Sequence, residues 1–197
     1  MSQFEKDEIR QRLIEAAREE FQKNGFEKAS IRTITAKAKT SKSNLYNYFK
    51  DKNHLFHSVL EPTVIKIRKG LESAKQYNTP KNTDEYTQES QSNVMGTIVK
   101  FVAENLTDVK LLLFKAQGSM IENFKYEVLE VFTDNMCNWV KSFKSGDKIS
   151  RLFVRSICSY YLSVIEQMIL YGRWEELPRL QHEISSFVYN GWRGVLK

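Results

Sequence analysis

The chain has 197 residues, 41% of them hydrophobic, which is enough apolar surface for a packed core and excludes a disordered chain. Its net charge is +6 at neutral pH, and it holds only three prolines and eight glycines. So few turn-forming residues exclude a many-stranded sandwich or barrel, which needs a break about every 8–12 residues. Long helices are therefore expected throughout.

The cysteines and the first residues narrow the class of protein further. Cys137 and Cys158 share neither a CxxC nor a metal-ligand spacing, so we expect reduced core thiols and no metal or other cofactor. Charged side chains run through Glu5–Arg12, where a signal peptide would need an apolar stretch. No stretch approaches the about 18 consecutive apolar residues of a membrane helix. We therefore expect a cytoplasmic protein without a membrane partner.

The net charge is concentrated in one short segment. Residues 28–52 contain seven basic side chains and one acidic side chain, so this segment carries the whole charge of +6 and the rest of the chain is neutral. The basic residues are Lys28, Arg32, Lys37, Lys39, Lys42, Lys50 and Lys52. A solvated loop is the usual explanation of a basic run, but this one also suits contact with nucleic-acid phosphates.

The first predicted helix spans Asp7–Asn24. Its apolar residues recur at spacings of three and four, which is typical of an amphipathic helix; they are Ile9, Leu13, Ala16, Ala17 and Phe21. Gly25 is expected to end the helix in a left-handed conformation. Phe26 would then contact Phe21 as the apolar pair of a Schellman motif.

Two short helices follow. Ser30 is expected to cap a helix over Ile31–Ala38, and residues 39–41 would form a turn. The third helix, Lys42–Phe49, has an apolar face and a face of hydrogen-bonding groups. The apolar face holds Leu45, Tyr48 and Phe49, and the polar face holds Lys42, Ser43, Tyr46, Asn47 and Lys50.

A fourth helix is expected to begin at Lys52 behind the cap Asp51, and Pro62 should kink or interrupt it. The polar stretch 76–91, which includes Pro80, predicts a loop and a domain boundary. From Val94 onward helical periodicity returns, through 98–106, 109–114, 120–143, 149–171 and 177–196. The prediction is an all-α protein of roughly nine helices. Its parts are a three-helix, homeodomain-like helix-turn-helix domain (1–52), a connecting helix (53–75) and a C-terminal helical bundle for ligand binding and dimerisation (76–197).

Two short helices joined by a tight turn, the second with a polar face, can place a recognition helix in the major groove of DNA. Lys42 can reach phosphate or guanine, and Asn47 can pair with adenine. Lys52 would lie beside phosphates, and Arg32 and Thr33 are further phosphate candidates. Double-stranded DNA is therefore the expected partner.

The pattern of residues 14–60 resembles the DNA-binding domain of the tetracycline-repressor (TetR) family. The residues that carry the resemblance are Ala16-Ala17, Phe21, Asn24-Gly25-Phe26, Ser30-Ile31, Ile34, Ala38, Leu45-Tyr46-Asn47-Tyr48-Phe49-Lys50-Asp51-Lys52 and Leu55. The resemblance covers the first third of the chain, and the later helices match only in number, length and polarity. It implies a bacterial transcriptional regulator, usually a repressor.

The resemblance also implies residue roles. Tyr48 and Lys52 would bind phosphate, while Leu45 and Phe49 would hold the recognition helix. The full set of expected DNA-binding residues is Arg32, Thr33, Lys39, Ser41, Lys42, Ser43, Tyr46, Asn47, Tyr48 and Lys52. Lys39-Thr40 and Ser43 depart from the family, which commonly has Gly-Val and Gly there. Lys39 must then adopt a conformation that glycine takes more easily, and Ser43 should alter base preference.

Proteins of this family are dimers that pair through their last two helices, which here are 149–171 and 177–196. Candidate interface residues are Val164, Met168, Phe187, Val188, Trp192 and Val195. Packing inside one chain explains each of them equally well. A homodimer is still expected, because two recognition helices can read a palindromic operator.

The middle helices carry large apolar side chains that could line a site for a small apolar or aromatic effector. The candidates are Phe101, Phe114, Gln117, Phe124, Met136, Trp139, Tyr160 and Glu166, although ordinary core packing explains most of them as well. The expected mechanism has two states, in which ligand moves the fourth helix about Pro62 and separates the recognition helices. Replacing Pro62 with alanine should then change the coupling between ligand and DNA.

Two other functions remain open at this point. An enzyme is disfavoured, because the chain lacks GxGxxG, Walker-type, HExxH and GxSxG motifs, and a surface pair is the favoured interpretation of His54 and His57. A protein-interaction module without sequence-specific DNA binding is the second alternative. The basic segment argues against it, and the salt dependence of binding would distinguish the two.

Overall fold

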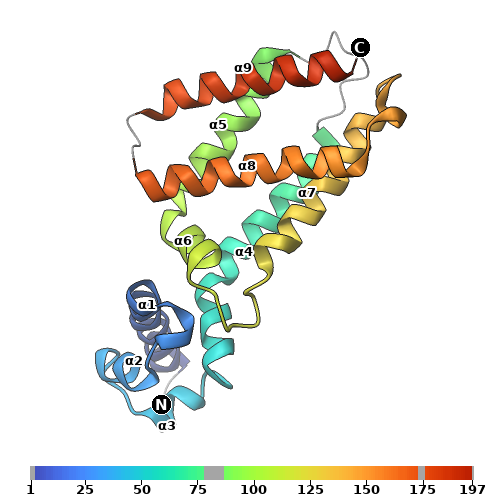
Figure 1. The fold of residues 1–197 in the computed structure, drawn as a ribbon. Helices are drawn as coiled ribbons and strands as arrows, with labels where there is room; N and C mark the ends of the chain where they lie inside the picture. The colour runs from blue at the N-terminus through green and yellow to red at the C-terminus, as the bar shows by residue number, and fades with distance from the viewer. Residues whose placement is uncertain (1–2, 78–86, 173–175, 197) are drawn as a thin grey trace. The chain divides into compact units, whose positions relative to one another are not determined.

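The computed structural model describes residues 3–77, 87–172 and 176–196, and these residues contain helices and no strands. The helices are α1 (Gln3–Lys28), α2 (Ile31–Lys37), α3 (Lys42–Tyr46), α4 (Lys52–Tyr77), α5 (Gln88–Glu104), α6 (Leu106–Phe114), α7 (Phe124–Lys141), a 3-10 turn (Gly146–Lys148), α8 (Arg151–Tyr171) and α9 (Leu177–Val195). The predicted all-α fold is therefore confirmed (Figure 1).

The chain divides into two compact units that do not follow chain order. The first unit contains residues 1–67 and 107–125, and the second contains residues 68–106 and 126–197. Helix α4 begins in the first unit and ends in the second, and α6 belongs to the first unit although it follows α5.

The prediction for the end of the first helix is only partly confirmed. Gly25 does take a positive φ of 72°, but its ψ of 170° leads into one further turn that ends at Lys28. Phe26 lies 6.1 Å from Phe21, ring centre to ring centre. However, the Phe26 N–H donates to the carbonyl of Lys115 at 2.8 Å, so the Schellman hydrogen bond back to the helix is not formed.

Helix α4 runs through Pro62 as one helix, so the proline does not interrupt it. Proline removes one backbone hydrogen bond from a helix. Here the ring is exposed, while Leu60, Thr63 and Val64 beside it are buried and hold the backbone in place. Burial of the apolar side of the helix thus outweighs the lost hydrogen bond.

Other boundaries shift by a few residues. Helix α5 begins at Gln88, six residues before Val94, where the helical periodicity was expected to return, because Thr87 and Ser90 form a reciprocal capping box at 3.1 and 3.2 Å. Residues 120–123, predicted helical, form turns before α7. The expected loop over 76–91 lies partly outside the described residues, as do residues 173–175 of the break before α9.

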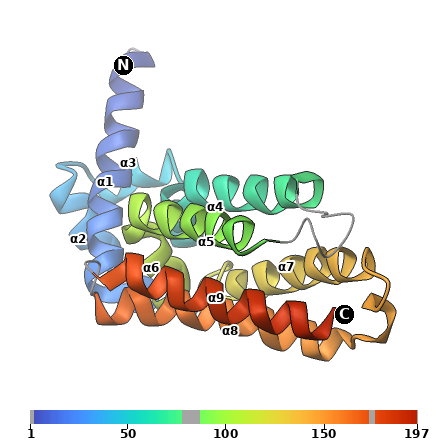
Figure 2. The ribbon, with the colours of Figure 1, turned by 90° about the horizontal axis from the view of Figure 1, so that it is seen from above.

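The second unit has a core of apolar residues from α5, α7, α8 and α9. Trp192 belongs to this core and lies at ring distances of 5.4 and 5.8 Å from Trp139 and Phe153. Arg155 bonds Glu130 at 2.8 Å and joins α8 to α7; this bond lowers the pKa of Glu130. Cys158 is fully buried, which raises the pKa of its thiol to about 11. Figure 2 shows α8 and α9 side by side in this unit.

Candidate nucleic-acid interface

Both short helices of the first unit are capped by serine side chains. The Ser30 hydroxyl accepts from the Thr33 N–H at 3.4 Å, as predicted, and the Ser41 hydroxyl accepts from the Asn44 N–H at 3.0 Å. Each cap satisfies a backbone donor that a helix N-terminus otherwise leaves unpaired. The two helices and their turn therefore form a defined helix-turn-helix (Figure 1).

The turn between these helices contains a left-handed lysine. Lys39 has a φ of 52° and is the non-glycine residue with positive φ in the described part of the chain. This confirms that the position needs the conformation that glycine adopts more easily. The side chain is exposed, so the strained backbone presents a cation to solvent beside the recognition helix.

Replacing Lys39 with glycine is therefore expected to raise the free energy of unfolding by about 0.5–1 kcal/mol while weakening DNA binding. Relief of the strained φ produces the first effect, and loss of the cation produces the second. Urea denaturation and a DNA titration measure them. Lys39→Asn is the control, since asparagine tolerates this conformation and also lacks the charge. An unchanged or lowered free energy of unfolding in Lys39→Gly would contradict the strain argument.

The recognition helix α3 is held by its apolar side. Leu45 and Phe49 are fully buried, as predicted, and Phe49 lies 5.7 Å from the His54 ring. The helix itself ends at Tyr46, three residues earlier than predicted, and Phe49 follows the turn at residues 47 and 48. Arg10 of α1 lies 5.6 Å from the centre of the Phe49 ring. Sequence reasoning missed Arg10, because it stands on a different helix 39 positions away in the printed sequence.

The opposite side of α3 presents Lys42, Ser43, Tyr46 and Asn47 to solvent, as predicted. The Asn47 amide donates to the Asn44 side-chain oxygen at 3.3 Å. Asn44 in turn donates to the Thr40 hydroxyl at 2.8 Å. Asn44 was missed in the sequence; it orients Asn47 and connects it to the turn.

Two cations of the basic segment, the expected DNA-binding residue Lys52 and Lys37, contact other groups of the same chain. The Lys52 ammonium donates to the carbonyls of Glu27 and Ala29 at 3.1 and 3.3 Å, and it lies 4.6 Å from the Phe26 ring centre. Lys37 forms an ion pair with Glu19. In this conformation the Lys52 ammonium stabilises the connection between α1 and α2.

The remaining expected DNA-binding residues differ in their exposure to solvent. Arg32, Thr33 and Ser41 are exposed, and Tyr48 is half-buried. Glu20, which sequence reasoning missed, is buried and accepts from the Ser30 N–H at 3.0 Å and from the Asn24 amide at 2.9 Å. It joins α1 to the start of α2.

Helix α6 is bound to this unit by a polar cluster. Asp108 is buried, forms an ion pair with Arg18 of α1, and accepts from the Thr63 hydroxyl at 2.7 Å. Arg18 also donates to the carbonyl of Val59 at 2.8 Å, and burial lowers the pKa of its guanidinium. Three helices of the first unit, α1, α4 and α6, therefore meet at one carboxylate.

The candidate effector residues are divided between the two units. Phe114, Gln117 and Phe124 belong to the first unit; Phe101, Met136, Trp139, Tyr160 and Glu166 belong to the second. Phe124 is buried and Phe114 is 40% exposed. In the second unit, Met136, Trp139 and Tyr160 pack against the core described above.

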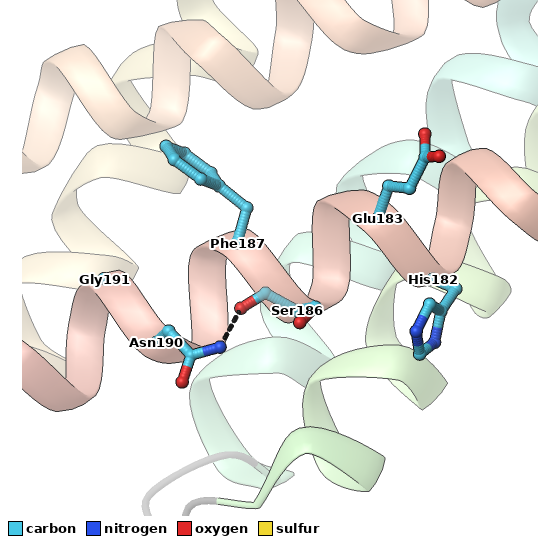
Figure 3. A pocket seen from close by; sticks show the side chains of 6 residues that line it. All are labelled: His182, Glu183, Ser186, Phe187, Asn190 and Gly191. Carbon is cyan, nitrogen blue, oxygen red and sulfur yellow. Dashed lines mark hydrogen bonds between the residues drawn. The ribbon is translucent and has the colours of Figure 1, made fainter.

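The candidate dimer residues fall into two groups. Met168, Val188 and Trp192 are buried within the second unit and have almost no surface to offer to a partner. Phe187 and Val195 are 66% and 41% exposed, and Val164 is partly buried against the core. Figure 3 shows Phe187 projecting from α9 in a shallow groove that is also lined by His182, Glu183, Ser186, Asn190 and Gly191.

These features define a helix-turn-helix protein with an exposed polar recognition helix. Residues 13–59 match the family model described as bacterial regulatory proteins of the tetR family. These residues are therefore a TetR-family DNA-binding domain, and the protein is a DNA-binding regulator of transcription. Members of this family are regulators and not enzymes, in agreement with the sequence prediction.

Solved structures show the same fold over nearly the whole chain. NalD, the secondary repressor of the MexAB-OprM multidrug efflux pump in Pseudomonas aeruginosa, has a TM-score of 0.68 at 14% identity, covering 99% of both chains. A TerR/AcrR-family regulator from Aquifex aeolicus has a TM-score of 0.61 at 20% identity, covering 91% of this chain and 97% of that chain. FadR from Bacillus subtilis, in complex with stearoyl-CoA, has a TM-score of 0.59 at 16% identity, covering 95% and 99%. A search of curated proteins finds no match.

Across residues 3–77, 87–172 and 176–196, every helix is too short or too polar to cross a lipid bilayer.

Proposed function

We propose that the protein is a homodimeric, ligand-responsive repressor that binds a palindromic operator. The exposed polar side of α3 carries this proposal, because Lys42, Ser43, Tyr46 and Asn47 are the side-chain types that contact base edges and phosphates in the major groove. A single helix of this length reads only a few bases, so useful specificity needs a second copy.

The first test is selection of DNA from a pool of random-sequence duplexes at physiological salt. The expected result is an enriched inverted repeat whose half-sites lie about one helical turn or slightly more apart. Enrichment of no sequence, with only salt-sensitive binding to any duplex, would contradict the proposal. It would favour the alternative of a protein-interaction module.

The α9 groove is the proposed centre of the dimer interface. Phe187 lies 5.9 Å from the Tyr160 ring on α8, yet two thirds of it is exposed. A Cβ added at Gly191 or Gly194 would meet no atom within 4 Å, so the surface beside Phe187 is open to close approach of a second helix. A large aromatic residue beside such a surface is typical of an interface anchor.

Phe187→Glu should therefore raise the dissociation constant of the dimer by at least about 30-fold, because it removes an anchor and places a charge in an apolar contact. Sedimentation velocity across a concentration series measures this constant. The matched control is Val131→Glu, which introduces the same charge at an exposed apolar residue of α7. A dimer of unchanged affinity in the Phe187 variant would place the interface elsewhere.

The proposed effector is a small apolar or aromatic molecule that binds the helical bundle. Support comes from the aromatic content of the second unit and from the stearoyl-CoA complex of the FadR structure, which identifies one compound to test. Helix α4 belongs to both units, so it is the proposed route by which ligand changes DNA affinity.

The effector test measures release of the selected duplex by stearoyl-CoA, with free coenzyme A as the control. Release by the acyl form alone would identify an apolar chain as the recognised group. If neither compound releases the duplex, a screen of aromatic compounds follows, and no response to any of them would contradict ligand control. Pro62→Ala should alter the response if α4 carries it.

A further inference from the structure

The main segment of α1 ends at the break at Gly25, and this end is completed by a residue from a distant part of the chain. The Lys115 ammonium donates to the carbonyls of Gln22 and Lys23, at 2.8 and 3.5 Å. These carbonyls belong to the last turn before Gly25, where the helical hydrogen bonding is broken. A cation at this end of a helix also interacts favourably with the helix dipole.

The Lys115 backbone contributes a second bond. Its carbonyl accepts the Phe26 N–H at 2.8 Å, the donor that a Schellman motif would have directed back into α1. A Cβ added at Gly25 would lie 3.7 Å from the same carbonyl. Lys115 thus caps α1 from outside in place of the local motif that the sequence predicts.

The residues that follow reach the other end of the helix-turn-helix domain. The Met120 N–H donates to the Asn53 side-chain oxygen at 2.8 Å, in the first turn of α4. Gly118 has a φ of 78°, and a Cβ built on it would lie 3.9 Å from the Phe26 ring. Ser119 is buried. Residues 115–121 therefore attach both to the end of α1 at Gly25 and to the start of α4.

Contacts of Phe26 and Lys52 connect the end of α1 to the start of α2, which precedes the recognition helix. Phe26 packs on Phe56 of α4 at a ring distance of 5.1 Å and supports the Lys52 ammonium. Lys52 holds the carbonyls of Glu27 and Ala29, immediately before the Ser30 cap of α2. Movement at the end of α1 would therefore be passed to α2 and to the turn that precedes α3.

We propose that Lys115 is a positioning residue for DNA recognition. By capping α1 it holds the helix-turn-helix in the orientation that reads a specific sequence, although it lies outside the domain that matches the family model. This inference goes beyond the proposed repressor function, since it requires neither an effector nor a dimer. Loss of the cap should affect sequence-specific binding more than general attraction to phosphate, because only base contacts depend closely on orientation.

The test compares Lys115→Met with Lys110→Met in the full chain. Each variant removes one positive charge: Lys110 lies in α6, and Lys115 is the residue after it. Lys110 is exposed and has no contact like the bond of Lys115 to the Gln22 carbonyl. Affinity is measured for the selected duplex and for a scrambled duplex of the same length, both at the same salt concentration. Hydrogen–deuterium exchange is followed in peptides covering residues 22–30 and 42–55.

Lys115→Met is expected to weaken binding to the selected duplex about tenfold, the loss that corresponds to one charge-assisted hydrogen bond. Its affinity for the scrambled duplex should equal that of Lys110→Met. Exchange should accelerate in residues 22–30 and 42–55, and Lys115→Arg should restore both measurements, since arginine can reach the same carbonyls. Lys115→Gln, which keeps one donor, should be intermediate.

Equal affinity of the two methionine variants for the selected duplex would overturn the proposal. So would equal loss of both duplexes with faster exchange throughout the chain, which would indicate general unfolding. If the selection yields no enriched duplex, the repressor proposal fails separately. The exchange measurements then still decide, because unchanged exchange in residues 42–55 of Lys115→Met would refute positioning of the recognition helix.

Discussion

Asp108→Ala is expected to lower the free energy of unfolding of the first unit by about 2–3 kcal/mol. The substitution leaves Arg18 partly buried without its carboxylate and leaves the Thr63 hydroxyl without its acceptor. Breaking a fully buried ion pair costs about 3–5 kcal/mol. The expected loss here is smaller, because 31% of the Arg18 side chain is exposed.

The positions of the tryptophans allow this loss to be assigned to one unit. All three tryptophans lie in residues 126–197, so their fluorescence reports on the second unit, whereas circular dichroism reports on every helix. In a urea titration of Asp108→Ala, circular dichroism should show an earlier transition than fluorescence. Unchanged circular dichroism would contradict a stabilising role for the ion pair.

A double variant provides the control for this experiment. Arg18→Met with Asp108→Leu removes both charges and keeps most of the apolar volume. It should recover much of the stability lost in Asp108→Ala, since the main cost of the single variant is the uncompensated charge. If the double variant loses as much free energy of unfolding as its two single variants lose together, then the two side chains do not act as a pair.

Alanine substitutions at Lys42 and at Lys52 should change the salt dependence of DNA binding by different amounts. Each phosphate contact contributes about −0.9 to the slope of log K against log salt on duplex DNA. Lys42→Ala should reduce the magnitude of the slope by about 0.9 and weaken binding, because its ammonium faces solvent on α3. Lys52→Ala should leave the slope unchanged, because its ammonium is engaged by the carbonyls of Glu27 and Ala29.

The two variants should also differ in stability. Lys52→Ala is expected to lower the free energy of unfolding by about 1–2 kcal/mol, through loss of the two carbonyl contacts and of the contact with the Phe26 ring. Lys42→Ala should change it by less than about 0.5 kcal/mol, as for most surface substitutions. A slope that falls by the same amount in both variants would show that Lys52 turns to phosphate when DNA binds.

Much of the first unit could be predicted because its determinants are local. The Ser30 and Asp51 caps, the positive φ at Gly25 and Lys39, and the buried Leu45 follow from residues within about four positions of each other. The Schellman motif was the exception. It failed because a competing acceptor, the Lys115 carbonyl, approaches Phe26 from a distant part of the chain.

The candidate effector and dimer residues were harder to identify from spacing. A helical period marks which side chains turn inward, but it does not distinguish a core from an interface. Phe187 and Trp192 stand on the same helix with similar chemistry, yet Phe187 is 66% exposed and Trp192 only 3%. The packing of α8 against α9 decides this difference.

By itself the sequence determined the all-helical class, the caps, the recognition helix and the location of the positive charge, because each depends on neighbours within one or two turns. Only the tertiary structure decided how the first unit is completed. The Asp108–Thr63 bond joins residues 45 positions apart and the Lys115–Gln22 bond joins residues 93 positions apart. Contacts at such separations leave no periodic signal in a single sequence, since any of many polar side chains could have supplied the partner.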